Sequence, residues 1–286
     1  MFQRNSRVRY LVTGGCGYVG QHVVSALISR GHEVVVASRT VADGAVGAEY
    51  LQVDILNDNR NLYEISGKPD VLIHLAWEDG FNHASSKHLS NIPQHVAFLR
   101  RMLEAGLKHI VGVGTMHEVG YHIGPVDEAT PTFPLHAYGI AKNYLRSVQT
   151  LMCKEFGAVD QWIRCYYIYG DDILNNSIFT KLLLAEAEGK TEFPLNTGEL
   201  LYDFIHVNEL GLQVADVSEQ SSVTGIVNCC SGEPVTLKTM VLRFIEENHL
   251  HIKPVWGAFS MRPYDSRALW GDPTKIQRVR ELRLGS

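Results

Sequence analysis

The sequence lacks the features that mark membrane, secreted and nucleic-acid-binding proteins. No apolar run approaches the roughly 18 residues that span a bilayer, and the N-terminal residues MFQRNSRVRY have no signal-peptide stretch. Basic residues form no cluster, and a net charge of -5 with a pI near 6.2 argues against a nucleic-acid surface. We therefore expect a cytoplasmic protein with no nucleic-acid partner and no membrane partner.

Cysteine is scarce as well. The five cysteines are odd in number and follow neither a disulfide-scaffold spacing nor a zinc-binding spacing. His83, His88 and His95 do not form a helical ligand motif such as HExxH. The sequence therefore predicts free thiols and no metal site.

What the sequence does contain is a glycine-rich turn, TGGCGYVG, at residues 13–20. An apolar run typical of a buried strand precedes it, and apolar residues at helical spacing follow it. Gly14 would permit the tight turn, Gly17 would let backbone approach a pyrophosphate, and Gly20 would let the helix pack closely on the strand. The segment therefore predicts a dinucleotide cradle.

Strands and helices alternate through the first part of the chain. This rhythm predicts an α/β fold with a Rossmann-type, doubly wound parallel sheet and a ligand at the carboxyl edge of its strands. The strands are expected at 8–13, 33–37, 50–55, 71–76 and 109–114, and the later helices at 91–105 and 138–152.

From about residue 170 the rhythm weakens into turn-rich segments and short apolar runs. We interpret residues 1–170 as a dinucleotide-binding Rossmann domain to which later segments return. Residues 171–286 are expected to form mainly a smaller C-terminal substrate-binding lobe. The segment DFIHVNEL is expected to contribute a strand and a turn.

Tyr138 and Lys142 form a YxxxK pair on one helical face. A lysine ammonium beside a tyrosine stabilises the phenolate, so the pair could act as a general acid or base. Thr115 follows the strand HIVGVG and could hydrogen-bond a substrate oxygen. Each residue also has a structural interpretation, a half-buried tyrosine, a solvated lysine and a helix-capping threonine.

The glycine loop, Thr115 and the YxxxK pair, in this order, resemble the extended short-chain dehydrogenase/reductase family, the NAD(P)-dependent epimerases, dehydratases and reductases of nucleotide sugars. The segment starting at Asn91 resembles the family's NVxGTxNLLEAA helix, RCYYIYG resembles RxxNVYGP, and YDFIHVNEL resembles RDFIHVDDL. The resemblance extends over nearly the whole chain.

The resemblance implies which residues bind the cofactor. Asp54 in VDI stands where the family contacts the adenine amino group, and Leu75 and Ala76 in HLAW stand along the cofactor. The implied cofactor-binding residues are Gly14, Gly17, Tyr18, Val19, Gly20, Ser38, Arg39, Asp54, Ile55, Leu75, Ala76, Tyr138 and Lys142.

The end of the second strand bears on the choice of cofactor. Members that prefer NAD end it with an acidic residue that accepts from the ribose 2′-OH. Here Ser38 and Arg39 stand there, and an arginine makes forked contacts to phosphate oxygens. We expect NADP(H), with NAD as the alternative in which Arg39 is a solvated charge or stacks on adenine.

Departures from the family pattern concern the substrate. Met116 and His117 replace the Asp-Glu pair of the dehydratases, which argues against a dehydratase, although His117 and Glu118 leave that question open. Tyr202 replaces a phosphate-binding arginine, and Tyr167 replaces the asparagine of NVYG. The expected substrate-binding residues are His117, Asn176, Ser177, Tyr202, Arg262 and Arg267.

Within the family, several segments look most like the nucleoside-diphosphate-4-keto-6-deoxyhexose 4-reductases, especially the 6-deoxytalose dehydrogenase group. The expected reaction is NADP(H)-dependent reduction or oxidation at C4 of a nucleotide-linked sugar, with Thr115, Tyr138 and Lys142 as catalytic residues. The alternatives are an NAD-dependent C4 epimerase and a non-catalytic nucleotide sensor. Family analogy implies a homodimer through the Asn91 and Tyr138 helices.

Overall fold

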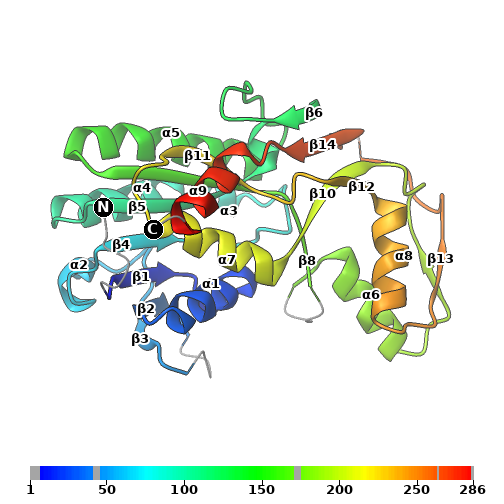
Figure 1. The fold of residues 1–286 in the computed structure, drawn as a ribbon, viewed down its shortest axis with the longest axis horizontal. Helices are drawn as coiled ribbons and strands as arrows, with labels where there is room; N and C mark the ends of the chain where they lie inside the picture. The colour runs from blue at the N-terminus through cyan, green and yellow to red at the C-terminus, as the bar shows by residue number, and fades with distance from the viewer. Residues whose placement is uncertain (1–6, 41–45, 171–174, 263, 285–286) are drawn as a thin grey trace.

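The computed structural model describes residues 7–40, 46–170, 175–262 and 264–284. Its main element is a parallel sheet with the strand order β11-β7-β5-β4-β1-β2-β3, which confirms the Rossmann-type α/β fold (Figure 1). The strands are β1 (Arg9–Thr13), β2 (Glu33–Ser38), β3 (Glu49–Gln52), β4 (Val71–His74), β5 (His109–Thr115), β7 (Val159–Cys165) and β11 (Gly225–Cys229). The strand order reverses between β1 and β4, where such sheets bind their ligands.

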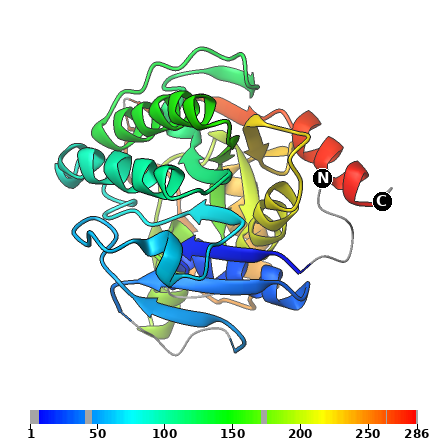
Figure 2. The same ribbon diagram turned by 90° about the vertical axis from the view of Figure 1, so that its left-hand side faces the viewer.

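Helices cover both faces of this sheet (Figure 2). One face packs on α1 (Tyr18–Ser29), α7 (Val207–Ser218) and α9 (Thr274–Leu284), and the other on α4 (Ile92–Glu104) and α5 (Ala137–Phe156). Side chains alternate along each strand, so Tyr10 and Val12 join the first core while Leu11 joins the second. Short helices α2 (Leu62–Ile65) and α3 (Lys87–Ser90) lie in the connections.

A smaller lobe lies beyond the carboxyl edge of the sheet, on the right in Figure 1. It has its own apolar core, which includes Phe179, Phe204 and Phe244. Its helices are α6 (Ile178–Ala187) and α8 (Leu237–Glu247). The strands outside the parallel sheet are β6 (Ile123–Val126), β8 (Tyr167–Tyr169), β9 (Glu192–Pro194), β10 (Leu201–His206), β12 (Pro234–Thr236), β13 (Lys253–Val255) and β14 (Ala268–Gly271).

Most of the expected elements are present, with one error. The helix expected at 91–105 is α4, and the strand expected at 109–114 is β5. The turn expected within DFIHVNEL is wrong, because β10 runs directly into the helix α7, whose first turn is capped by His206. The proposed boundary at residue 170 adjoins residues 171–174, outside the described ranges, and stays a prediction.

The segments α7, β11 and α9 return to the parallel sheet after the lobe. All five cysteines are free thiols, as the sequence predicted. No helix in the described ranges is both long and apolar enough to cross a membrane.

A buried carboxylate ties the returning helices to the first one. Asp216 on α7 accepts from Arg30 at 2.8 Å, from Arg283 at 2.9 Å and from Arg280 at 3.3 Å. Its side chain is only 2% exposed and that of Arg30 only 11%. The cluster therefore joins α1, α7 and α9 at one point.

We expect Asp216→Asn to lower the free energy of unfolding by about 2–3 kcal/mol, because Arg30 would lose a charged partner in a poorly solvated place. Denaturant unfolding measures this loss. Glu281→Gln is the control, because Glu281 pairs with Arg278 at 3.0 Å on the surface and should cost less than about 0.5 kcal/mol. Equal losses in the two variants would contradict the role of burial.

Candidate active site

The glycine loop has the geometry that a dinucleotide requires. Gly14 has a φ of +73°, and a Cβ there would lie 2.7 Å from the Ala76 nitrogen. A Cβ at Gly20 would lie 2.1 Å from the Gly14 oxygen, so only glycine lets α1 pack on the loop. Gly17, the N-cap of α1, is less crowded, with its nearest neighbour 3.2 Å from an added Cβ. The loop and the first turn of α1 therefore fit a pyrophosphate.

The other residues expected at the cofactor lie around this loop. Leu75 follows β4, and its N–H donates to Thr13 O at 3.1 Å, while Ala76 N–H donates to Thr13 Oγ1 at 3.3 Å. The Asp54 carboxylate accepts from Leu56 N–H at 3.1 Å and from the Asn57 side chain at 2.8 Å, which shapes the turn after β3. The remaining expected residues near the loop and this turn are Tyr18, Val19 and Ile55.

The end of β2 holds an ion pair that the sequence did not reveal. Arg39, which follows Ser38, donates to the carboxylate of Glu78, and Asn91 donates to the other oxygen of that carboxylate at 2.9 Å. Partial burial of Glu78 opposes its ionisation, but these hydrogen bonds still lower the pKa of its carboxyl. The Arg39 guanidinium is thus engaged by a negative charge.

Thr115, Tyr138 and Lys142 meet at the carboxyl edge of the sheet. Thr115 ends β5, and its side chain lies close enough to Tyr138, in the first turn of α5, to act on the pKa of that phenol. Gly139 makes this contact possible, because a Cβ there would lie 2.4 Å from the His117 oxygen. His136 caps the helix by accepting from Gly139 N–H at 3.3 Å. The geometry therefore brings together the three residues expected to be catalytic.

Lys142 is buried one helical turn after Tyr138 on α5. Its Nζ donates to the Val113 oxygen at 2.6 Å and lies 3.9 Å from the centre of the Trp77 ring, a cation–π contact. Burial lowers the pKa of Lys142 to about 8, and burial raises the pKa of Tyr138 above its usual value. Tyr138 is therefore a phenol at neutral pH. The lysine one helical turn away titrates about one unit above neutral pH.

A group of histidines surrounds the open side of Tyr138. The His83 ring stacks on Tyr138 with centroids 5.4 Å apart and on His136 at 4.5 Å, and His117 lies 4.4 Å from His83. Burial lowers the pKa of His83 to about 4 and lowers the pKa values of His117 and His136 as well. The three rings are neutral at pH 7 and present N–H groups and lone pairs rather than charge.

His83, His117 and His136 also place ring nitrogens within 4.8 Å of one another, a spacing that a metal ion could use. Two observations disfavour a cation there. Nδ1 of His136 accepts from Gly139 N–H, so Nε2 of the neutral ring carries the proton and lacks a free lone pair. The positive charge of Arg262 also acts on all three rings. The arrangement suits hydroxyl or carbonyl oxygens better than a metal ion.

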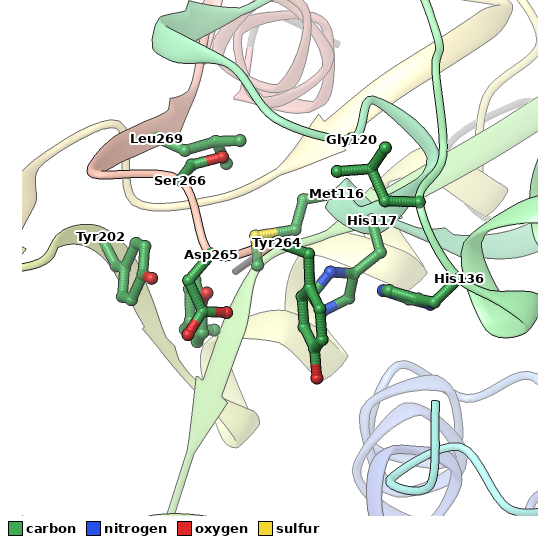
Figure 3. Close-up of a pocket in the computed structure, with 11 residues that line it drawn as sticks. Met116, His117, Gly120, His136, Tyr202, Tyr264, Asp265, Ser266 and Leu269 are labelled. Carbon is green, nitrogen blue, oxygen red and sulfur yellow. The ribbon is translucent and has the colours of Figure 1, made fainter. Parts of the chain in front are cut away.

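A pocket opens beside these histidines (Figure 3). In the close-up, His117 and His136 point toward each other, with the Tyr264 ring next to them. The lining residues come from the turn after β5, from the segment before α5, from β8 and β10, and from β14 and the segment before it. They are Met116, His117, Gly120, Leu135, His136, Tyr167, Tyr202, Tyr264, Asp265, Ser266 and Leu269.

The expected substrate residues are distributed unevenly around this pocket. His117 and Tyr202 line it, and Arg262 lies 5.9 Å from the Tyr264 ring. Arg267 is exposed and does not line it. The Ser177 hydroxyl caps α6 by accepting from Thr180 N–H at 3.2 Å, and Asn176 is exposed next to it, so their substrate roles remain predictions.

Several residues of the site were missed at the sequence level. His83, His136 and Trp77 contact Tyr138 or Lys142, and Tyr264 and Asp265 line the pocket. His136 could have been found, because it precedes Tyr138 by two residues at the expected start of a helix. The late segment was noticed as unusual, but only the fold places it beside the histidines.

Comparison with known proteins identifies the family of the chain. Residues 10–230 match the NAD dependent epimerase/dehydratase family. The chain is 45% identical over 276 residues to the dTDP-6-deoxy-L-talose 4-dehydrogenase (NAD(+)) of Aggregatibacter actinomycetemcomitans, across 91% of this chain and 98% of that protein. It is 26% identical to a UDP-glucose 4-epimerase of Corynebacterium glutamicum, across 82% and 78% of the two chains.

Solved structures share the fold. The UDP-glucose 4-epimerase of Thermotoga maritima, solved with UDP-glucose, matches with a TM-score of 0.80 at 21% identity, covering 94% of this chain and 91% of that one. The UDP-N-acetylglucosamine 4-epimerase of Methanobrevibacter ruminantium M1 matches with a TM-score of 0.83 at 18% identity, covering 96% and 92%. At these identities the likeness shows the fold alone.

The glycine loop yields a test that separates binding from folding. We expect Gly17→Ala to weaken NAD+ binding by tenfold or more, about 1.4 kcal/mol, while unfolding free energy changes by less than about 1 kcal/mol. Gly20→Ala should instead cost about 3 kcal/mol of stability, because its Cβ would overlap the Gly14 oxygen. Calorimetric titration and denaturant unfolding measure the two effects. Unchanged NAD+ affinity in Gly17→Ala would place the pyrophosphate elsewhere.

Proposed function

Since the chain belongs to the NAD dependent epimerase/dehydratase family, we propose that it transfers hydride between a nicotinamide dinucleotide and C4 of a 6-deoxyhexose carried on a nucleoside diphosphate. The observation that carries the proposal is the contact of Tyr138 with Thr115 beside the buried ammonium of Lys142. The 45% identity to a dTDP-6-deoxy-L-talose 4-dehydrogenase supports the sugar and favours deoxythymidine as the base.

The bound dinucleotide supplies the acceptor or donor of the hydride. In the direction of reduction, Tyr138 donates its phenolic proton to the C4 oxygen and Thr115 orients that oxygen by a hydrogen bond. In the direction of oxidation, Tyr138 first loses its own proton to solvent, and the phenolate then accepts the proton of the C4 hydroxyl as the hydride leaves C4. Lys142 places a positive charge near the tyrosine and lowers the cost of forming its phenolate.

The substrate half of the proposal rests on the pocket beside Tyr138. His117 and His136 can hydrogen-bond sugar oxygens without adding charge, and Tyr202 and Tyr264 offer aromatic faces. Arg262 lies nearby and is the candidate partner for the diphosphate, where many family members use an arginine in place of Tyr202. Asn176 and Ser177, at the start of α6, remain further candidates for the diphosphate.

For the cofactor we propose NAD(H), a departure from the NADP(H) expected from Ser38 and Arg39. The Glu78 carboxylate engages Arg39 and would repel a 2′-phosphate placed beside it. The relative at 45% identity is itself described as NAD(+)-dependent. Arg39 then serves the adenosine end by stacking or by hydrogen bonding to the ribose.

A C4 epimerase is the second candidate, because the chain is also 26% identical to a UDP-glucose 4-epimerase across 82% of its length. An epimerase returns the hydride to the same sugar and accumulates no reduced cofactor. A non-catalytic nucleotide sensor is disfavoured because Tyr138 and Lys142 are both present and in contact with the rest of the site.

We also infer a homodimer through α4 and α5. The outer face of α5 carries exposed apolar side chains at helical spacing, with Ile140 45%, Tyr144 53% and Leu151 67% exposed. An apolar stripe of this kind is typical of a helix that packs against another subunit.

One test of the proposed function concerns the proton donor. With dTDP-6-deoxy-L-talose and NAD+, we expect the wild-type protein to accumulate reduced cofactor, and Tyr138→Phe to lower kcat by about 10²–10⁴ with NAD+ binding retained. Tyr144→Phe on the exposed side of α5 is the matched control and should keep full activity. Near wild-type turnover of Tyr138→Phe would remove the tyrosine from the mechanism. Turnover of the sugar without accumulation of reduced cofactor would favour the epimerase.

Another test concerns the choice between NAD+ and NADP+. Calorimetric titration should give NAD+ at least a tenfold advantage over NADP+, about 1.4 kcal/mol. Glu78→Gln should narrow that ratio, because Arg39 would be released to a 2′-phosphate and the repelling carboxylate removed. Tighter NADP+ binding by the wild type would restore the expectation from Ser38 and Arg39.

A further inference from the structure

A buried carboxylate stands directly behind Thr115. Glu118 has a fully buried side chain, and its Oε1 accepts from Thr115 N–H at 2.8 Å and from Trp162 Nε1–H at 2.9 Å. The Thr115 Oγ1 accepts from His117 N–H at 3.3 Å, so Thr115 caps the short helical turn Met116–Glu118. This pair of contacts fixes the backbone at the point where β5 ends.

The space for this carboxylate is built into the strand. A Cβ at Gly114 would lie 2.0 Å from Glu118 Oε1 and 2.2 Å from Trp162 Nε1. Glycine at this position therefore admits the side chain beneath the sheet edge. Glu118 does not line the substrate pocket, so it is not placed to remove a proton from a sugar as the acidic residues of the dehydratases do.

The second oxygen of Glu118 faces two arginines. Arg164 Nε, fully buried, lies 3.5 Å from Oε2, and Arg146 Nε lies 4.0 Å away. A buried ion pair of this kind contributes little net stability compared with apolar residues of similar size. Stability alone therefore does not explain why a charged carboxylate is buried at this place.

The charge of Glu118 reaches the catalytic pair. It raises the pKa of Lys142, against the lowering by burial, and it raises the pKa of Tyr138 in the same direction as burial. Other titratable groups also face these two residues. The groups that face Tyr138 or Lys142 are Cys165, His74, His83, His88, His95, His117 and His136.

Most of these neighbours carry no charge at neutral pH. Burial raises the pKa of Cys165 to about 12 and lowers the pKa values of His74, His95 and His83. Arg164 and Arg146 are fixed positive charges, and both lie against the Glu118 carboxylate. Glu118 is therefore the anionic group that acts on the catalytic pair within the described residues.

We propose that Glu118 is a positioning residue that holds Thr115 in place and supplies the buried negative charge behind the end of β5. The inference rests on the proposed function, because Thr115, Tyr138 and Lys142 are catalytic only if that function holds. Glu118 touches neither substrate nor cofactor and acts through Thr115 and Lys142.

The test is the pH dependence of turnover in Glu118→Gln. Removing the negative charge lowers the pKa values of both Lys142 and Tyr138, so oxidation should begin at lower pH and reduction should be lost at lower pH. We expect two limbs of the pH–rate profiles, the acidic limb of oxidation and the alkaline limb of reduction, to move down by about half a pH unit to one pH unit. Glu118→Asp, which keeps the charge but shortens the reach to Thr115, should lower kcat while leaving the limbs in place.

Two further variants separate a loss of stability in Glu118→Gln from the shift of its pH profile. Glu118→Gln leaves Arg164 buried without its partner, so the double variant Glu118→Gln/Arg164→Met removes both charges and should recover stability while keeping the shifted limbs. Asp216→Asn, a buried carboxylate far from Tyr138, should lose stability with unshifted limbs. If the single variant fails to fold, the double variant carries the test.

The outcomes distinguish this inference from the proposed function. A profile of Glu118→Gln that superimposes on the wild type overturns the role of Glu118. Absence of wild-type turnover with any nucleotide sugar overturns the proposed function instead. In that case the pH dependence of NAD+ binding, measured by calorimetry on the wild type and Glu118→Gln, reports the shift without a substrate, and identical binding profiles overturn the inference.

Discussion

The site depends on one close backbone contact, between the first turn of α5 and the turn after β5. Gly139 lies so near the His117 oxygen that no side chain fits between them. The contact places Tyr138, one residue earlier, against Thr115. The Tyr138 N–H also donates to the His83 oxygen at 3.1 Å, which attaches a third segment to the same point. The end of β5, the first turn of α5 and the segment that contains His83 are thus held together, and the pocket forms beside them.

Burial at this junction determines which chemistry is accessible. The low polarity around Tyr138 disfavours its phenolate, and the same surroundings lower the pKa of Lys142 to about 8. The Val113 oxygen and the Trp77 ring hold the ammonium, and Glu118 adds a negative charge behind Thr115. A tyrosine that stays a phenol at neutral pH is suited to donate its proton in the direction of reduction, whereas oxidation requires its phenolate, which the Lys142 charge makes less costly to form.

The sequence predicted the cofactor half of the molecule better than the substrate half. The glycine loop, the parallel strands and the Tyr138–Lys142 spacing are local patterns, and each depends on residues within one turn or one element. The pairing of Arg39 with Glu78 joins residues far apart in the chain, so the sequence left Arg39 available for a phosphate. The sequence also did not predict that the Glu118 side chain is buried, because its position depends on the space that the absence of a side chain at Gly114 leaves in β5.

The substrate half is assembled from long-range pairings. Tyr167 on β8 and Tyr202 on β10 stack with centroids 4.0 Å apart, because the two strands pair in parallel, with Tyr167 opposite Phe204. Two aromatic rings therefore fill the places where family members carry an asparagine and an arginine. The positive charge near the pocket comes instead from Arg262, in a segment about 60 residues later. The wall of the pocket is thus assembled from β8, β10 and the segment before β14, which lie far apart in the chain, so no local pattern in the sequence could have placed these residues together.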